Sequence, residues 1–251
     1  MSGHSKWKTN KGKKTAADAV KGATYTKIIK EITVVAREGG GNPDTNSKLR
    51  ALIAKAKVAN MPSDNVKMAI KRGTGELPGV VYETVTYEGY GPSGVAIMVE
   101  ALTDNKNRAS AELRNIFSKK NGNLAGAGSV SWMFSKKGYI LIEKPADIKE
   151  DDLLNLVLEA GCEDMKSDEK NYEITCPPQD FEKVKAAIKN RGISWQLAEI
   201  TMVPASSIKV TGPEAKQVLE LVEALEEHED VQNVYANFDI PDEILEQASS
   251  K

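Results

Sequence analysis

The sequence predicts an α+β protein with an N-terminal helical bundle followed by two α/β sandwich domains, the third domain being inserted into the second. Apolar residues recur with the period of a helix between residues 15 and 73. After residue 79, short β-rich segments bounded by turn residues alternate with helical patterns. The 251 residues, of which 40% are apolar and 28% charged, provide enough material for several folded domains.

Three amphipathic helices are expected in the first domain, residues 1–79. The first ends at three glycines followed by an Asn-Pro-Asp turn, the second is broken by Pro62, and a short third ends at Gly73. Lysines occupy the outer faces of these helices. Residues 1–14 precede them as a lysine-rich flexible arm with one anchor, Trp7.

The second domain is predicted from two separate stretches, residues 80–135 and 206–240. Its expected elements are strands at 80–88 and 95–102, a helix at 106–120, a glycine-rich link at 121–128, strands at 129–134 and 207–210, a helix at 213–229 and a strand at 231–238.

The third domain, residues 136–205, has a pattern of its own. Its expected elements are a strand at 139–143, a helix at 148–160, strands at 162–167 and 171–176, a helix at 179–191 and a strand at 195–203. This βαββαβ order is that of a complete ferredoxin-like unit. We therefore predict that it is inserted into the second domain.

Composition excludes several classes of protein. The chain has no run of about 18 apolar residues, and its cationic N-terminus is not followed by an apolar segment, so we expect neither a membrane span nor Sec export. Cys162 and Cys176 form no Cys-x-x-Cys pair, and only two histidines are present. We expect reduced thiols, a cytoplasmic location, no metal and no cofactor.

Charge is distributed very unevenly along the chain. Residues 1–75 contain 16 Lys and Arg against 5 Asp and Glu, a local net charge of +11, whereas the remainder carries −13. Such a basic segment indicates a polyanionic partner, and phosphate binding requires cations spread over a surface. The candidate nucleic-acid-binding residues are Lys6, Lys8, Lys11, Lys13, Lys14, Lys21, Lys27, Lys30, Lys55, Lys57, Lys71 and Arg72.

No catalytic constellation is apparent. The Gly-Lys-Lys-Thr run at 12–15 lacks the first glycine and the preceding strand of a phosphate-binding loop. The acidic pairs at 151–152 and 226–227 stand on predicted helices, where adjacent side chains diverge. His228 has no serine or cysteine nearby in the sequence to activate, so a surface or helix-end role is favoured. The sequence therefore predicts a protein that is not an enzyme.

A weaker signal marks a partner surface at one end of the second domain. Its candidate residues are Tyr87, Tyr90, Asp104, Asn105 and Arg108, although turn and capping chemistry explain most of this pattern. The acidic helix at 213–229 is interpreted as a solvated face, with a protein-binding surface as the alternative. Trp7 and Tyr25 are interpreted mainly as packing residues, since two aromatics make a poor stacking platform.

Several ordered motifs resemble the YebC/PmpR family along nearly the whole chain. They are Gly-His-Ser-Lys-Trp at 3–7, Thr-Lys-Ile-Ile-Lys-Glu-Ile at 26–32, the glycines at 39–41, Ala-Asn-Met-Pro at 59–62, Tyr-Glu-Gly-Tyr-Gly-Pro at 87–92, Thr-Asp-Asn at 103–105 and Gly-Asn-Leu at 122–124. The resemblance also implies the three-domain architecture. It implies either regulation of transcription through promoter DNA or a role in translation, as in relatives that activate mitochondrial translation or relieve ribosome stalling at proline-rich stretches.

The arm departs from the family pattern. Lysines at 8–14 stand where many relatives carry a His-Arg-Lys-type cluster, and Lys-Gly-Ala at 21–23 replaces a basic-Gly-basic triplet. These changes keep the positive charge but remove the bidentate guanidinium group. We predict a nucleic-acid-binding regulatory protein, first of all a DNA-binding transcriptional regulator. The alternative is a ribosome-associated translation factor that binds ribosomal RNA.

Overall fold

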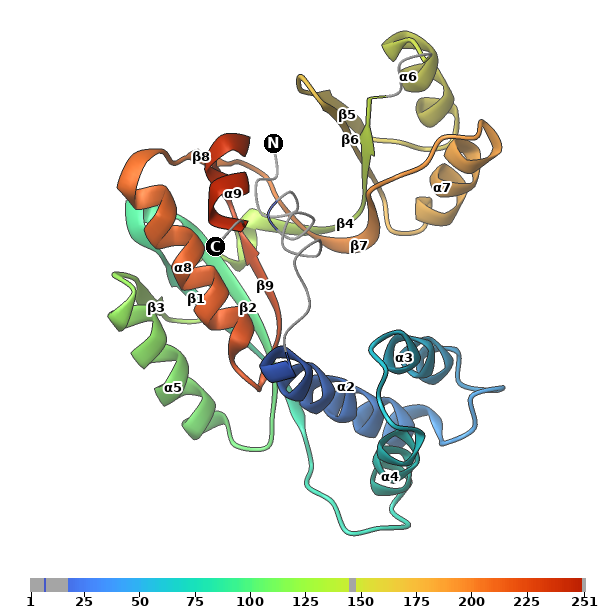
Figure 1. The fold of residues 1–251 in the computed structure, drawn as a ribbon, viewed down its shortest axis with the longest axis vertical. Coiled ribbons are helices and arrows are strands. Elements are labelled where there is room, and N and C mark those ends of the chain that lie inside the picture. Colours follow the sequence, from blue (N-terminus) through green and yellow to red (C-terminus); the bar gives the residue numbers. More distant parts are fainter. Residues whose placement is uncertain (1–6, 8–17, 145–147, 250–251) are drawn as a thin grey trace. The chain divides into compact units, whose positions relative to one another are not determined.

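The computed structural model describes residue 7, residues 18–144 and residues 148–249, and it has the predicted α+β fold (Figure 1). Contacts divide the described chain into two compact units. One unit contains residues 18–129 together with Gly212–Val234, and the other contains Val130–Thr211 and the described residues from Tyr235 onward.

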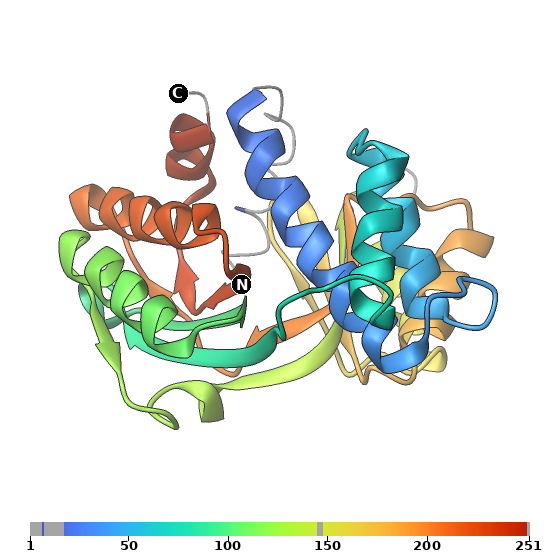
Figure 2. The same ribbon diagram turned by 90° about the horizontal axis from the view of Figure 1, so that it is seen from below.

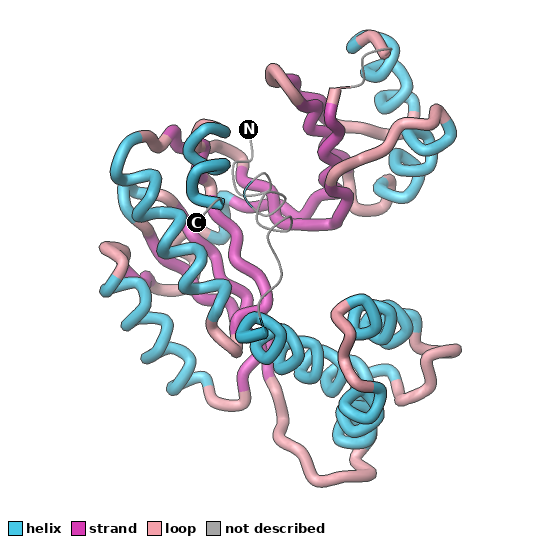
Figure 3. The backbone as a smooth tube through the Cα atoms, viewed as in Figure 1, coloured by secondary structure: helices cyan, strands magenta, loops and turns pink. Residues whose placement is uncertain are grey.

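The first unit begins with the predicted three helices, α2 (Asp18–Gly39), α3 (Ser47–Val58) and α4 (Ser63–Thr74). Figure 3 shows helix and loop alone in this part of the described chain. Their shared core contains Ile28, Ile32 and Leu49. Asn46 fixes the turn between α2 and α3, because its Oδ1 accepts a hydrogen bond from the Leu49 N–H at 3.1 Å while its Nδ2 donates to the Val35 carbonyl at 3.0 Å.

The remainder of the first unit is a four-stranded sheet with the order β3-β1-β2-β9. Its elements are β1 (Glu83–Tyr90), the short helix η1 (Pro92–Gly94), β2 (Ala96–Thr103), α5 (Lys106–Lys119), β3 (Asn123–Ala125), α8 (Gly212–Glu227) and β9 (Val231–Ala236). Helices α5 and α8 lie side by side over one face of this sheet (Figure 2). Phe117 and Leu221 are fully buried there. Gly89 is required beneath Phe117, because a Cβ atom at this position would lie 2.7 Å from the ring.

The second unit contains a sheet with the order β5-β6-β4-β7, the strand order of a ferredoxin-like βαββαβ unit. Its elements are the short helix η2 (Ser131–Met133), β4 (Phe134–Glu143), α6 (Glu150–Glu159), β5 (Asp164–Ser167), β6 (Asn171–Cys176), α7 (Phe181–Asn190) and β7 (Leu197–Pro204). Helices α6 and α7 pack on this sheet around a buried core that includes Ile140, Leu153, Ile174 and Val184. Strands β8 (Ile208–Lys209) and β10 (Phe238–Asp239) form a separate parallel pair, and α9 (Asp242–Ser249) follows.

Three sequence-based expectations differ from the structure. The strand expected at 129–134 is wrong, because η2 occupies Ser131–Met133 and β4 starts only at Phe134. The expected link at 121–128 contains β3, which pairs with β1 through Leu124 and Gly89. Helix α9 was not expected. Among the described residues, no helix is long and apolar enough to cross a membrane.

Candidate nucleic-acid interface and the Asp230 network

The predicted binding residues of the arm and of the start of α2 are not described. Lys6, Lys8, Lys11, Lys13, Lys14 and Lys21 lie outside the residues whose side chains the structure describes. Trp7, the expected anchor of the arm, is only 3% exposed. Tyr25 has the expected structural role, because its hydroxyl donates a hydrogen bond of 2.8 Å to the Asn60 carbonyl in the turn between α3 and α4.

Helices α3 and α4 carry many of the exposed cations of the first unit, and others lie on α5. Helix α3 carries Lys48, Arg50, Lys55 and Lys57 and contains no Asp or Glu, and all four side chains are exposed. Lys55 pairs with Glu31 of α2 at 3.0 Å. Lys71 and Arg72 are exposed in the last turn of α4. These helices therefore present a cationic surface that a polyanion can approach.

Lys27 and Lys30 have a different placement, because both point toward the C-terminal end of α8. The Lys27 ammonium donates a hydrogen bond to the Glu226 carbonyl, and Lys30 donates to the Glu229 carbonyl at 3.2 Å. Lysines are favoured at this position because the carbonyls at the end of a helix carry partial negative charge. Lys30 also forms an ion pair with Asp230 and is 6% exposed, so its charge is satisfied inside the unit.

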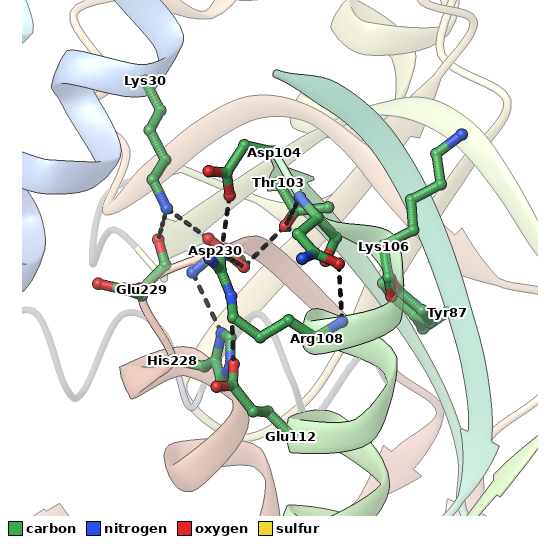
Figure 4. Close-up of polar contacts among 11 residues, drawn as sticks. Lys30, Tyr87, Thr103, Asp104, Lys106, Arg108, Glu112, His228, Glu229 and Asp230 are labelled. Atoms are coloured by element: carbon green, nitrogen blue, oxygen red, sulfur yellow. Dashed lines mark hydrogen bonds and ion pairs between the residues drawn. The ribbon is translucent and has the colours of Figure 1, made fainter. Parts of the chain in front are cut away.

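Asp230 is the centre of a buried polar network that joins α2, β2, α5 and β9 (Figure 4). Its carboxylate pairs with Lys30 and accepts hydrogen bonds of 2.9 Å from both the Thr103 hydroxyl and the Arg108 guanidinium. Burial opposes ionisation of Asp230, but the hydrogen bonds from Lys30, Arg108 and Thr103 outweigh it, so the pKa of Asp230 lies below its ordinary value. The carboxylate also raises the pKa of Arg108 through its hydrogen bond.

His228 lies beside this network. Its Nδ1 accepts a hydrogen bond of 3.1 Å from the Asp230 N–H, which places the ring proton on Nε2, 3.0 Å from Glu112. Donor atoms of Glu112, His228 and Asp230 lie within 4.8 Å of one another, a spacing that a metal ion could bridge. However, the cationic side chains of Lys30 and Arg108 and the Thr103 hydroxyl already engage the Asp230 carboxylate, so a metal ion would have to displace them.

The structure brings together four of the five residues of the predicted partner surface. Asn105 caps α5, Arg108 bridges Asp104 and Asp230 at 2.9 Å each, and the Tyr87 hydroxyl donates to the Lys106 carbonyl at 3.1 Å. Tyr90 lies at the other end of β1, where its hydroxyl donates to the Ser129 carbonyl. Sequence reasoning missed Asp230, whose position between an acidic helix and a strand gives no signal of its role.

The described chain combines a helical segment that carries exposed cations with two four-stranded sheets covered by helices, so it is an α+β protein. The chain belongs to the TACO1/YebC family, because residues 5–76 match the TACO1/YebC protein N-terminal domain and residues 82–238 match the TACO1/YebC second and third domain. This finding confirms the family resemblance stated from the motifs.

Relatives of similar length support this assignment. The chain is 54% identical, over 99% of its length and 100% of the relative, to a probable transcriptional regulatory protein of Dictyoglomus turgidum. It is 52% identical to a probable transcriptional regulatory protein of Geobacter sulfurreducens, over 98% of this chain and 99% of the relative. A crystal structure of a conserved hypothetical protein from Aquifex aeolicus matches with a TM-score of 0.71 and 44% identity, over 89% of this chain and 92% of the other.

Proposed function

We propose that this protein is a DNA-binding transcriptional regulator, not an enzyme, and that it acts in the cytoplasm. The observation that carries the proposal is the exposed surface of α3 and α4, where Lys48, Lys57, Lys71 and Arg72 are exposed and α3 has no acidic residue. The names of the relatives, probable transcriptional regulatory proteins, support the same reading.

Binding in this proposal is driven by phosphate contacts. Lysines and arginines that neutralise phosphates release counterions, which supplies affinity without fixed base contacts. The arm adds Lys11, Lys13 and Lys14, which precede these helices in the sequence, to the proposed binding residues. Lys30 is not part of the proposed surface because Asp230 neutralises it, and Lys27 contributes less because it is directed at α8.

The α/β parts would then engage other proteins. The residues Tyr87, Asp104, Asn105 and Arg108 lie near one another, and α8 carries Glu214, Glu220, Glu223, Glu226 and Glu227 along its length. We include a protein-binding role for this region in the proposal, because its acidic charge repels nucleic acid.

Crosslinking of the protein to nucleic acid in growing cells, followed by sequencing of the attached fragments, tests this function. We expect enrichment at discrete promoter sites. Dominant crosslinks to one region of large-subunit ribosomal RNA would overturn the transcriptional proposal and identify a translation factor instead. A variant with Lys48→Glu and Lys57→Glu serves as the control, because it should lose the specific crosslinks.

A further inference from the structure

Strand β1 has an open edge over its first half. Its neighbour on one side, β2, pairs with it along all of Glu83–Tyr90. On the other side, β3 pairs with β1 only at Glu88–Tyr90, because β3 ends at Ala125. No other strand of the described chain lies on that side of β1, since the sheet has the order β3-β1-β2-β9. The sheet is therefore open beside residues 83–87.

The pairing pattern shows which backbone groups this edge presents. At the hairpin between β1 and β2, the Gly91 N–H donates to the Val95 carbonyl at 2.8 Å, so these residues form a hydrogen-bonded pair. Because such pairs alternate along an antiparallel ladder, Val85 also directs its N–H and C=O groups toward β2. Thr84 and Thr86 therefore direct theirs toward the open edge. Both threonines are exposed, and their backbone groups form no hydrogen bond outside the sheet with any described residue.

The composition of this edge suits the addition of a strand. Unpaired backbone donors and acceptors are a template for a further strand, and proteins usually blunt such edges with lysine, proline or a bulge. The segment Glu-Thr-Val-Thr-Tyr at 83–87 contains neither lysine nor proline, pairs with β2 without a bulge and is rich in β-branched residues. Its one charged residue, Glu83, forms an ion pair with Lys106 at 2.5 Å. The edge therefore offers backbone hydrogen bonds beside side chains whose charge is balanced.

We propose that an extended, uncharged segment of a partner protein binds to this edge as an additional strand. The segment continues β3 beyond Ala125 and runs antiparallel to β1, with its backbone paired to Thr84 and Thr86. This inference rests on the protein-binding part of the proposed function, because Tyr87 of the predicted partner surface lies at the same end of the sheet. It does not depend on nucleic-acid binding by α3 and α4.

Amide hydrogen exchange of the full chain, followed by NMR, tests this proposal within one protein. Without a ligand, the N–H groups of Thr84 and Thr86 should exchange at least about tenfold faster than that of Val85, which is held in the ladder to β2. The probe is a short peptide of alternating threonine and valine with blocked ends and a polyethylene glycol tail for solubility. Its addition should slow exchange at Thr84 and Thr86 by about fivefold or more and leave Val85 unchanged.

Three forms of the same peptide, compared by fluorescence anisotropy, show whether binding uses the backbone. One is unmodified, one carries N-methyl groups on alternate residues and therefore along a single edge, and one is methylated on every residue. A strand has two edges, so the second form can still pair with β1 and should bind within about threefold of the first. The third form has no N–H to donate and should bind at least about tenfold more weakly.

Two substitutions of one residue locate the site on β1. Thr86→Pro removes the N–H that faces the open edge but leaves the ladder to β2 intact, so it should weaken binding of the unmodified peptide by about fivefold or more. Thr86→Ala keeps this N–H and should bind within about twofold of wild type. Both variants should retain the DNA affinity of wild type. If Thr86→Pro does not fold, the methylated peptides decide the question with the wild-type chain.

Equal binding of the unmodified and fully methylated peptides overturns the inference, as does unchanged exchange at Thr84 and Thr86 when the peptide is added. Protection of these two N–H groups that rises with protein concentration in the absence of peptide would place a second copy at the edge, which also overturns the proposed partner. DNA binding by the same preparation separates these results from the proposed function, because absence of DNA binding at low salt would count against that function alone.

Discussion

Asp230 is fully buried in its ionised form, so its contribution to folding depends on keeping all of its partners. Lys30, Arg108 and Thr103 each contact its carboxylate. A buried ion pair gives little net stability compared with an apolar pair, but removal of one partner leaves the others uncompensated. The network therefore makes the position of α2 against the sheet specific rather than simply stable.

Replacement of Asp230 by Asn should therefore lower the free energy of unfolding by about 3–5 kcal/mol at pH 7, because Lys30 and Arg108 lose their buried counterion. Urea unfolding followed by circular dichroism measures this change. Asp44→Asn is the matched control, because the Asp44 side chain is exposed, and it should change stability by less than about 0.5 kcal/mol.

The same pair of proteins should differ in their response to acid. Since the pKa of Asp230 is lowered in the folded state from its ordinary value of 3.8, its stabilising effect is complete above that pH and is lost as pH falls through the folded-state pKa. The stability difference between wild type and Asp230→Asn should stay constant from neutral pH to about pH 5 and shrink below about pH 4. A difference unchanged down to about pH 2 would contradict the assigned ionisation.

The two thiols provide another prediction for single residues. Burial raises the pKa of the Cys176 thiol to about 11 and also raises the pKa of Cys162. Because the thiolate is the reactive form, both residues should react with Ellman's reagent at pH 8 at least about 100-fold more slowly in the folded protein than in urea. Fast stoichiometric release of the chromophore under native conditions would show that one thiol is accessible.

Most elements follow from local patterns, whereas the polar network does not. The ferredoxin-like order could be predicted because each of its helices and strands has a clear apolar period. Strand β3 could not be predicted, because Asn123–Ala125 is short and follows Gly122 in a glycine-rich segment that is typical of a link. The role of Lys30 was beyond sequence reasoning, since its partner Asp230 is 200 residues away and only the tertiary fold brings them together.

Helix α3 is the element on which the proposed binding surface can be tested. Reversal of Lys48 and Lys57 to Glu should weaken binding to duplex DNA by more than about tenfold and reduce the slope of log affinity against log salt by about 1 for each lost phosphate contact. Fluorescence anisotropy at several salt concentrations measures both. Stability should change little, because both side chains are exposed.

The matched control makes the same charge change in the other unit. Lys189 and Arg191 are exposed at the end of α7, so Lys189→Glu with Arg191→Glu alters the net charge of the protein equally. If both double variants lose affinity to the same extent, net charge rather than the α3 surface controls binding.

At the scale of the whole molecule, we propose three domains at residues 1–79, 80–135 plus 206–240, and 136–205. The first boundary lies in an exposed segment, where Val80 and Val81 are 47% and 64% exposed. Thermolysin cleaves before large apolar residues, so it should cut the folded protein first near these two valines. Mass spectrometry of the early fragments identifies the cut, and a first cut within 83–125 would contradict this boundary.

The uneven charge of the whole chain leads to the last prediction. The arm holds Lys11, Lys13 and Lys14 within the segment of net charge +11, and the rest of the chain, at −13, repels nucleic acid. Reversal of these three lysines to Glu should therefore abolish most DNA binding with little loss of stability. The control is a variant with Lys183→Glu, Lys189→Glu and Arg191→Glu, which changes the net charge of the protein equally. If the wild-type protein contacts about six phosphates, its affinity should fall about 10³-fold between about 50 and 200 mM salt. A flat salt response would contradict a phosphate-driven interface. Unchanged affinity of the variant with Lys11, Lys13 and Lys14 reversed would show that the arm contributes no contacts and that binding is confined to the helices.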